Sequence, residues 1–331
     1  MSSPGANPYV KVQDHSITFR NQKSRGYALR NFSFTAAKGE VIGIVGESGS
    51  GKSILGLSLL GLLPESAIVD TREVILGGEK ILLTSKSDLR KVRGPILGMI
   101  FQDPVNSLDP CYTIGYQLKE VLQRNPKVKN WLTEARQLLE GVGIADGERR
   151  LGSYPHELSG GLCQRVQIAL ALAQNPKVLI ADEPTTALDV TIQKQVMELL
   201  MRKREEYDFT LILISHDLGL ISQYCDRTLV LYAGEKMEEG PAVEVLRHSR
   251  HPYTRALLEA LPYHDEGLLK PIPGLVPDLR EMPKGCVFYG RCERQTEMCQ
   301  TVKPQLTTDG THGFFCHHPH PVKEQHGASR V

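Results

Sequence analysis

The stretch Gly46-Glu47-Ser48-Gly49-Ser50-Gly51-Lys52-Ser53 decides the fold of this 331-residue chain. It fits the pattern G-x-x-x-x-G-K-[ST], with an apolar run at 41–45 before it and a largely apolar run at 54–60 after it. That context predicts a strand, a phosphate-binding loop and a helix. In such a loop glycines let backbone N–H groups approach phosphate oxygens, Lys52 reaches the β- and γ-phosphates, and Ser53 ligates Mg²⁺. An ordinary Gly/Ser turn is the alternative, and the strand and helix on either side disfavour it.

A second stretch, Val178-Leu179-Ile180-Ala181-Asp182-Glu183-Pro184, carries two adjacent acids at the end of an apolar strand. The carboxyl ends of strands are where a doubly wound sheet usually places its chemistry. Asp182 suits the Mg²⁺ shell, and Glu183 suits a general base that polarises the attacking water, because phosphoryl transfer needs neutralised charge and an oriented nucleophile. Taken alone, the dipeptide would more simply be a solvated acidic turn.

Further motifs follow in a fixed order, and through them the chain resembles the ATP-binding cassette (ABC) family. Leu158-Ser159-Gly160-Gly161 precedes a helical run at 164–173 and is similar to the family signature. Gln102 resembles the Q-loop, Ala187-Leu188-Asp189 the D-loop, and Ile214-Ser215-His216-Asp217 the switch-histidine segment. Six motifs in register are very hard to obtain by chance.

The resemblance implies a nucleotide sandwich between two cassettes. One subunit contributes residues that bind ATP and act on it: Gly46 to Ser53, Gln102, Asp182, Glu183 and His216. The other contributes the signature residues Ser159, Gly160, Gly161 and Gln164, with Asp189 in the D-loop. Catalysis is expected from Glu183, His216 and Gln102, and Mg²⁺ binding from Ser53, Gln102 and Asp182. The signature departs from the usual pattern at Leu162-Cys163, and the adenine-stacking aromatic is either Phe19 or Tyr27.

The fold expected is α/β, a P-loop ATPase core with an inserted helical subdomain. Short strands are predicted before residue 101, most clearly at 29–34 and 41–45, and again at 177–182, 210–215 and 228–232. The insert spans about 103–175, with amphipathic helices predicted at 114–123 and 131–142. We predict an ATPase domain over 1–250 and a Cys-rich extension over 251–331.

Composition excludes several classes of function. A net charge of +1 gives no support for a nucleic-acid partner. The sequence contains no uninterrupted run of about 18 apolar residues, the length that a membrane-spanning helix requires. The first residues do not resemble a secretory signal. Any role at a membrane is therefore expected to come through a partner.

The C-terminal region narrows the resemblance. His251-Pro252-Tyr253-Thr254 and Gly285-Cys286-Val287-Phe288-Tyr289-Gly290-Arg291-Cys292 are similar to the extension of ATPases of the peptide/nickel importer family. This resemblance implies import of dipeptides or oligopeptides at the inner face of a bacterial membrane. It also implies two permease subunits, a second and different ATPase, and a periplasmic or lipoprotein solute-binding protein. Nickel or antimicrobial-peptide import by the same family stays open.

Four of the seven cysteines crowd into this extension: Cys286, Cys292, Cys299 and Cys316. Four thiolates among Gly, Pro and polar residues suit a closed site, which could hold Zn²⁺ or a [4Fe–4S] cluster. The wide C-x5-C-x6-C spacing and the family resemblance favour the cluster, since zinc sites usually show C-x2-4-C pairs. Nothing in the sequence places this extension near the phosphate site, so we expect it to have a stabilising role.

Three other functions remain in view. A soluble ABC ATPase acting on DNA or ribosomes would typically carry two cassettes or a long coiled coil, and this chain has neither. A regulatory cassette that binds ATP without hydrolysing it is disfavoured by the intact Glu183 and His216. A metal-binding structural module describes only the tail.

Overall fold

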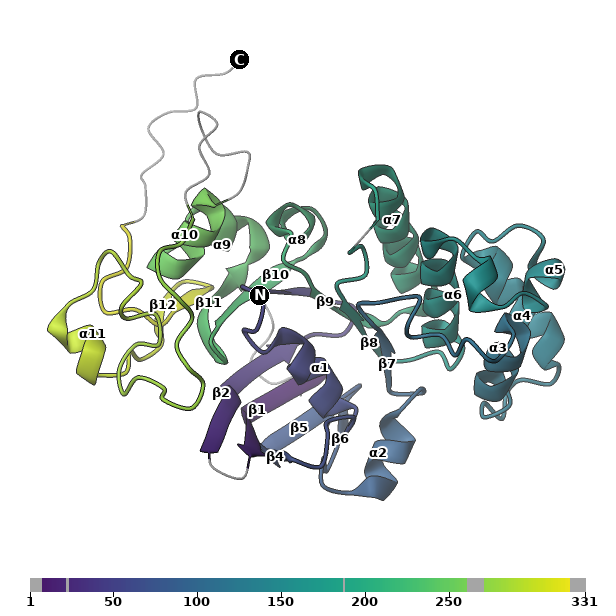
Figure 1. The fold of residues 1–331 in the computed structure, drawn as a ribbon, viewed down its shortest axis with the longest axis horizontal. Helices are drawn as coiled ribbons and strands as arrows, with labels where there is room; N and C mark the ends of the chain where they lie inside the picture. The colour runs from purple at the N-terminus through teal and green to yellow at the C-terminus, as the bar shows by residue number, and fades with distance from the viewer. Residues whose placement is uncertain (1–7, 22–23, 187, 261–270, 322–331) are drawn as a thin grey trace, which may run out of the picture.

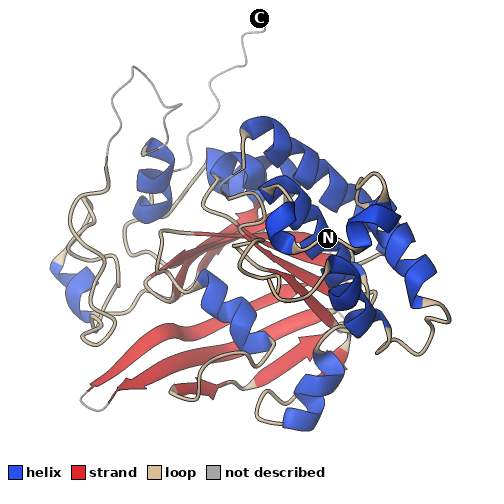
Figure 2. Ribbon diagram, turned by 45° about the vertical axis from the view of Figure 1, so that its right-hand side comes forward, coloured by secondary structure: helices blue, strands red, loops and turns tan. Residues whose placement is uncertain are grey.

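The computed structural model describes residues 8–21, 24–186, 188–260 and 271–321. Two sheets and the helices around them make up the architecture (Figure 1). In Figure 2 the strands form the lower part of the molecule, and most helices lie above them. The fold expected from the sequence, an α/β core with a helical insert, is confirmed.

The larger sheet has eight strands in the order β12-β13-β11-β10-β3-β9-β8-β7. Its parallel part is the predicted core, and its strands are β3 (Val41–Val45), β7 (Leu97–Ile100), β8 (Val178–Asp182), β9 (Thr210–Ile214) and β10 (Arg227–Tyr232). Nearly every residue of these strands is buried because helices and the second sheet cover both faces. That burial explains why they read as continuous apolar runs rather than as alternating ones.

The second sheet is antiparallel and lies N-terminal to most of the core. It contains β1 (Val10–Asn21), β2 (Ser24–Ala36), β4 (Ala67–Asp70), β5 (Glu73–Leu76) and β6 (Glu79–Lys80). Helix α1 (Lys52–Leu59), which follows the phosphate-binding loop, buries Leu55 and Leu59 in a core shared by this sheet and one face of the parallel strands. The N-cap of the short α2 (Lys86–Val92) is Ser85, whose hydroxyl accepts a hydrogen bond from the Asp88 N–H.

The helical insert contains α3 (Ile114–Leu122), α4 (Trp131–Gly141), α5 (Gly147–Leu151), a 3₁₀ turn (Pro155–Glu157) and α6 (Gly160–Leu172). The first two match the sequence prediction to within one residue at their C-terminal ends. Each begins at a residue whose side-chain oxygen accepts backbone N–H bonds, Thr113 for α3 and Asn130 for α4. In Figure 1 the insert lies at the opposite end of the molecule from the C-terminal extension.

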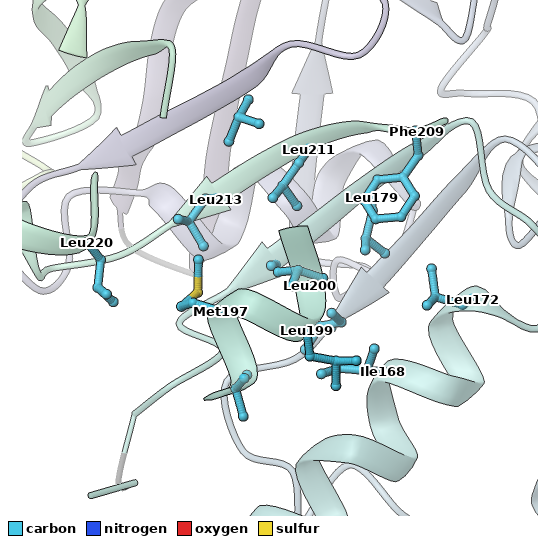
Figure 3. Close-up of a cluster of buried hydrophobic side chains, with 14 of the residues drawn as sticks. Ile168, Leu172, Leu179, Met197, Leu199, Leu200, Phe209, Leu211, Leu213 and Leu220 are labelled. Carbon is cyan, nitrogen blue, oxygen red and sulfur yellow. The ribbon is translucent and has the colours of Figure 1, made fainter. Parts of the chain in front are cut away.

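The other face of the parallel sheet packs against α6 and α7 (Val190–Tyr207). Figure 3 shows Ile168 and Leu172 of α6 beside Leu199 of α7, with Leu179 of β8 and Leu211 of β9 nearby. All five are at most 3% exposed. This shared core joins the helical insert to the ATPase sheet.

The C-terminal region contributes strands that the sequence did not predict. After α8 (Leu218–Tyr224), β11 (Glu235–Pro241), α9 (Ala242–Arg247) and α10 (Pro252–Glu259), the chain forms α11 (Glu297–Thr301), β12 (Thr307–Asp309) and β13 (His312–Phe314). Strand β13 pairs antiparallel with β11 and β12 pairs with β13, so these two short strands of the C-terminal region extend the ATPase sheet. No helix of the described ranges is both long and apolar enough to cross a membrane.

A buried carboxylate anchors this region. Glu238 of β11 is 0% exposed and accepts hydrogen bonds from the Arg250 N–H at 2.6 Å, the His251 N–H at 3.1 Å and His312 Nε2 at 2.7 Å. The three donors come from the segment that leads into α10 and from β13. A buried acid is tolerated here because its oxygens are satisfied.

We expect Glu238→Ala to lower the free energy of unfolding by about 3 kcal/mol, because three donors lose their acceptor in a buried place. Thermal unfolding would measure the change, and limited proteolysis would show whether the region beyond residue 250 is released first. Glu244→Ala, at an exposed position on α9, is the matched control and should unfold like the wild type. Equal unfolding temperatures for the two variants would contradict the anchoring role of Glu238.

Candidate active site

The phosphate-binding loop connects the carboxyl end of β3 to the N-terminus of α1, as the sequence predicts. Gly46 and Gly51 have φ values of 154° and 102°, and a Cβ at either would meet the Leu231 or Ala28 carbonyl oxygen at 2.1 or 2.5 Å. Only glycine fits both the conformation and the space. The loop therefore follows the strands closely, with its backbone N–H groups and the helix N-terminus available to an anion.

Lys52 is folded back over this loop. Its Nζ donates to the Gly46 carbonyl at 2.8 Å and the Glu47 carbonyl at 2.9 Å, and the residue is 5% exposed. Burial lowers the pKa of the ammonium, while Glu183, Asp182 and Glu47 act in the opposite direction. The positive charge thus lies where phosphate oxygens of a bound nucleotide would compensate it.

Asp182 and Ser53 form the oxygen pair expected to bind Mg²⁺. The Ser53 hydroxyl donates to Asp182 Oδ1 at 3.1 Å, and burial raises the pKa of the Asp182 carboxyl. A hydroxyl and a carboxylate this close fit the hard-oxygen preference of Mg²⁺. Gln102, the third expected ligand, donates from its amide Nε2 to Glu183 at 2.8 Å, which leaves its amide oxygen for the predicted Mg²⁺ contact.

Glu183 is the centre of a small polar cluster. Three groups approach its Oε2: Gln102 Nε2 at 2.8 Å, Thr186 Oγ1 at 2.8 Å and His216 Nδ1 at 3.3 Å. The Glu183 backbone is left-handed, with φ of 47°, and its N–H donates to the Ile214 carbonyl at 2.9 Å. Non-glycine residues rarely adopt this conformation outside sites where the surroundings enforce it. The sequence analysis did not select Thr186, although its place three residues after Glu183 is a usable signal.

The signature residues lie on the helical insert, at the start of α6. Ser159 is its N-cap and accepts the Leu162 N–H at 3.4 Å, and Ser159 and Gly160 are exposed. Gln164 differs from Ser159 in being only 1% exposed, with Nε2 unpaired among the described side chains. Gln164 was expected to face a partner's ATP, but in this structure it lies inside the insert because it falls on the buried side of α6.

The remaining sequence candidates can be placed as follows. Asp189 caps α7, with Oδ1 accepting the Ile192 N–H at 3.0 Å, while Ala187 of the same motif lies outside the described residues. Tyr27 is 40% exposed on β2, whereas Phe19 is partly buried against the core under the antiparallel sheet. Of the two aromatics, Tyr27 is therefore the more exposed.

The structure overturns a further expectation, because the C-terminal extension does reach the phosphate-binding loop. Arg291 donates to both carboxylate oxygens of Glu47, from Nη1 at 2.7 Å and from Nη2 at 3.1 Å. The Glu47 N–H donates to Tyr253 Oη at 2.9 Å. The two ends of each contact lie more than 200 residues apart along the chain, which is why sequence reasoning missed them.

The four extension cysteines line one small cavity together with His317 and His318. Burial raises the pKa of the Cys286 thiol to about 11 and that of Cys316 to about 12. Among the residues that the structure places, no group of three or more Cys, His, Asp or Glu side chains could hold a metal ion. The structure thus brings the four predicted cysteines together without supporting the predicted cluster.

The fold and the loop-centred arrangement of Lys52, Asp182, Glu183 and His216 define an ABC-type ATPase. Family models agree: residues 29–186 match "ABC transporter" and residues 237–299 match "Oligopeptide/dipeptide transporter, C-terminal region". The chain belongs to the family of dipeptide and oligopeptide ABC transporter ATP-binding proteins, and it is the ATP-hydrolysing subunit of an ABC importer.

Similar proteins cover nearly the whole chain. The dipeptide transport ATP-binding protein DppD of Haemophilus influenzae is 44% identical over 94% of this chain and 95% of its own length. The oligopeptide transport ATP-binding protein OppD of the same organism is 44% identical over 91% and 94%. A dimeric structure of the ATP-binding cassette MJ0796, bound to ADP and Pi after hydrolysis, is 29% identical with a TM-score of 0.62. The alignment with this structure covers 70% of the present chain and 98% of the MJ0796 chain.

Glu183→Gln should nearly abolish ATP turnover and leave ATP affinity close to that of the wild type. The amide cannot accept the proton of the attacking water, while the loop that binds the phosphates is unchanged. Phosphate release from the assembled transporter and binding of a fluorescent ATP analogue would measure the two effects separately. Turnover at the wild-type rate would refute Glu183 as the base.

Proposed function

We propose that this chain powers the import of dipeptides or oligopeptides through an ABC transporter of the bacterial inner membrane, from its cytoplasmic face. The observation that carries the proposal is the presence, in one chain, of an ABC cassette and the oligopeptide/dipeptide transporter C-terminal region. The relatives that match over more than nine-tenths of the chain are named for dipeptide and oligopeptide transport. Selection of the peptide would belong to the solute-binding protein and the permeases.

We infer the following roles for the site residues. The loop from Gly46 to Ser53 binds the triphosphate of ATP, with Lys52 at the β- and γ-phosphates. Ser53, Gln102 and Asp182 would hold Mg²⁺, which neutralises phosphate charge when it is bound. Glu183 orients the attacking water and accepts its proton, and Gln102 and His216 hold the carboxylate in place. Ser159, Gly160 and Gly161 complete the site of a second cassette, an assignment favoured by the exposure of Ser159 and Gly160 at the start of a helix.

Gln102 provides a route from ATP to the membrane partners. Its amide contacts Glu183 at one side, and the segment that follows it leads into the helical insert. Three apolar or aromatic residues just beyond it are exposed, Val105 at 48%, Tyr112 at 45% and Tyr116 at 44%, and the two tyrosines stack at 4.4 Å. Exposed aromatic groups of this kind suit a docking surface. We assign this surface to the permease subunits, two of which would pair with this ATPase and a second, different one.

We also propose that Cys286, Cys292, Cys299 and Cys316 ligate a [4Fe–4S] cluster, with Zn²⁺ as the alternative. In support, the four thiols line one cavity, and Cys₄ is the usual ligand set of such a cluster. Each cysteine of a cluster binds a different iron, so the four sulfurs need not meet at one point as they must around a single zinc ion.

The transport proposal can be tested by gentle purification of the tagged chain from detergent-solubilised membranes, followed by mass spectrometry of the proteins that accompany it. We expect two multispanning permeases and a second ABC ATPase, because an importer needs all of them. The associated solute-binding protein would then identify the substrate class, including nickel chelates if the peptide assignment is wrong. Recovery with ribosomal or DNA-associated proteins instead would overturn the transport role.

The cysteine site has its own test. Protein purified anaerobically should contain about four irons and four sulfides per chain and absorb in the visible range, and Cys292→Ser should lower the iron content. Cys111→Ser, at an exposed cysteine outside the extension, is the control and should leave iron unchanged. Zinc without iron or sulfide would contradict the cluster.

A further inference from the structure

Arg291 of the C-terminal extension forms a bidentate pair with Glu47, the second residue of the phosphate-binding loop. Nη1 lies 2.7 Å from Oε2 and Nη2 lies 3.1 Å from Oε1. The Arg291 side chain is 7% exposed, so water screens this pair much less than it screens the ion pairs on the surface. Such two-point pairs fix the relative orientation of the two groups as well as their distance.

The guanidinium is itself held from the extension side. Nε donates to the Pro273 carbonyl at 2.8 Å, Nη2 to the Ile272 carbonyl at 3.3 Å, and Nη1 to Tyr232 Oη at 3.1 Å. The group also lies over the Tyr232 ring, with its central carbon 5.6 Å from the ring centroid. Because these contacts use most of its donors, Arg291 is a fixed point against which Glu47 is positioned.

The same extension holds the nucleotide side of the molecule at two further points. The Glu47 N–H donates to Tyr253 Oη, which lies in an aromatic cluster with Tyr232 and Phe288. The Tyr27 N–H on β2 donates to the Leu279 carbonyl at 3.1 Å. Residues beyond 250 thus hold three parts of the nucleotide side: the backbone of the phosphate-binding loop, the Glu47 carboxylate and the strand β2 that carries Tyr27.

We propose that Arg291 is a positioning residue for ATP, acting through Glu47. It fixes the first turn of the phosphate-binding loop, and it neutralises a carboxylate that would otherwise repel the triphosphate. The inference rests on the assignment of residues 46–53 as the ATP site. Arg291 touches neither Asp182 nor Glu183 among the described contacts, so its effect should be on ATP binding rather than on the chemical step.

The test compares variants in the assembled transporter by the KM for ATP and kcat, and in the full chain by binding of a fluorescent ATP analogue. Arg291→Ala should raise KM and the Kd about tenfold and change kcat less than about twofold. Arg291→Lys, which keeps the charge and loses the fork, should lie between it and the wild type. Arg280→Ala removes an equally charged side chain of the extension, which among the described residues pairs with exposed Asp278 alone, and should leave both constants unchanged.

A double variant separates charge from packing. Arg291→Ala with Glu47→Gln should recover most of the lost affinity, because the repelling carboxylate is gone although the loop contact is still missing. Thermal unfolding of each variant checks that the fold is retained. Affinity that stays as low as in Arg291→Ala would overturn the electrostatic role, and a KM unchanged in Arg291→Ala would overturn the inference as a whole. If Lys52→Ala also binds ATP normally, the assignment of the ATP site is what fails.

Discussion

Parallel pairing of β3, β9 and β8 is the constraint on which the site depends. The strands lie side by side in register, Val41 opposite Leu211 and Leu211 opposite Leu179, so that their carboxyl ends meet at one edge of the sheet. The phosphate-binding loop follows β3, His216 comes two residues after β9, and Asp182 and Glu183 lie at the end of β8. The phosphate-binding loop and the two acids are more than 100 residues apart in sequence. They form one site because parallel pairing places the carboxyl ends of their strands next to each other.

Burial makes that edge chemically useful. Asp182 and Lys52 are almost inaccessible, and each is held near its neighbours by hydrogen bonds rather than by water. Charges in such a place interact more strongly than on the surface, and their hydrogen bonds fix their orientation. The left-handed backbone at Glu183 also fixes the orientation of its side chain. The hydrogen bond from the Glu183 N–H to the Ile214 carbonyl holds the turn that presents the carboxylate.

Local sequence pattern was sufficient for the core strands and for the phosphate-binding loop, whereas the signature, Q-loop, D-loop and switch-histidine segments were identified through a family resemblance. Apolar runs located β3, β8, β9 and β10, and hydrophobic periodicity located α3 and α4. Both signals are local because a buried strand is apolar throughout and an amphipathic helix is apolar on one face. Local pattern was insufficient where structure depends on distant pairing. Strands β12 and β13 are three residues each and exist through β11, the burial of Gln164 depends on how α6 packs, and the Arg291 pair with Glu47 joins opposite ends of the chain. None of these leaves a periodic signal.

The pairing of β13 with β11 has a consequence for synthesis of the chain. The phosphate-binding loop leaves the ribosome 244 residues before Arg291 does, and the acceptor carboxylate Glu238 appears 74 residues before its partner His312. The nascent ATPase core therefore exists for many seconds with an open sheet edge and with loop and acid unpaired, at the usual elongation rate of about 5–20 residues per second. An open edge of this kind invites pairing with other chains until the last strand covers it. The β11 edge is thus covered, and Glu47 thus gains its partner Arg291, only after long stretches of chain that follow them have been made.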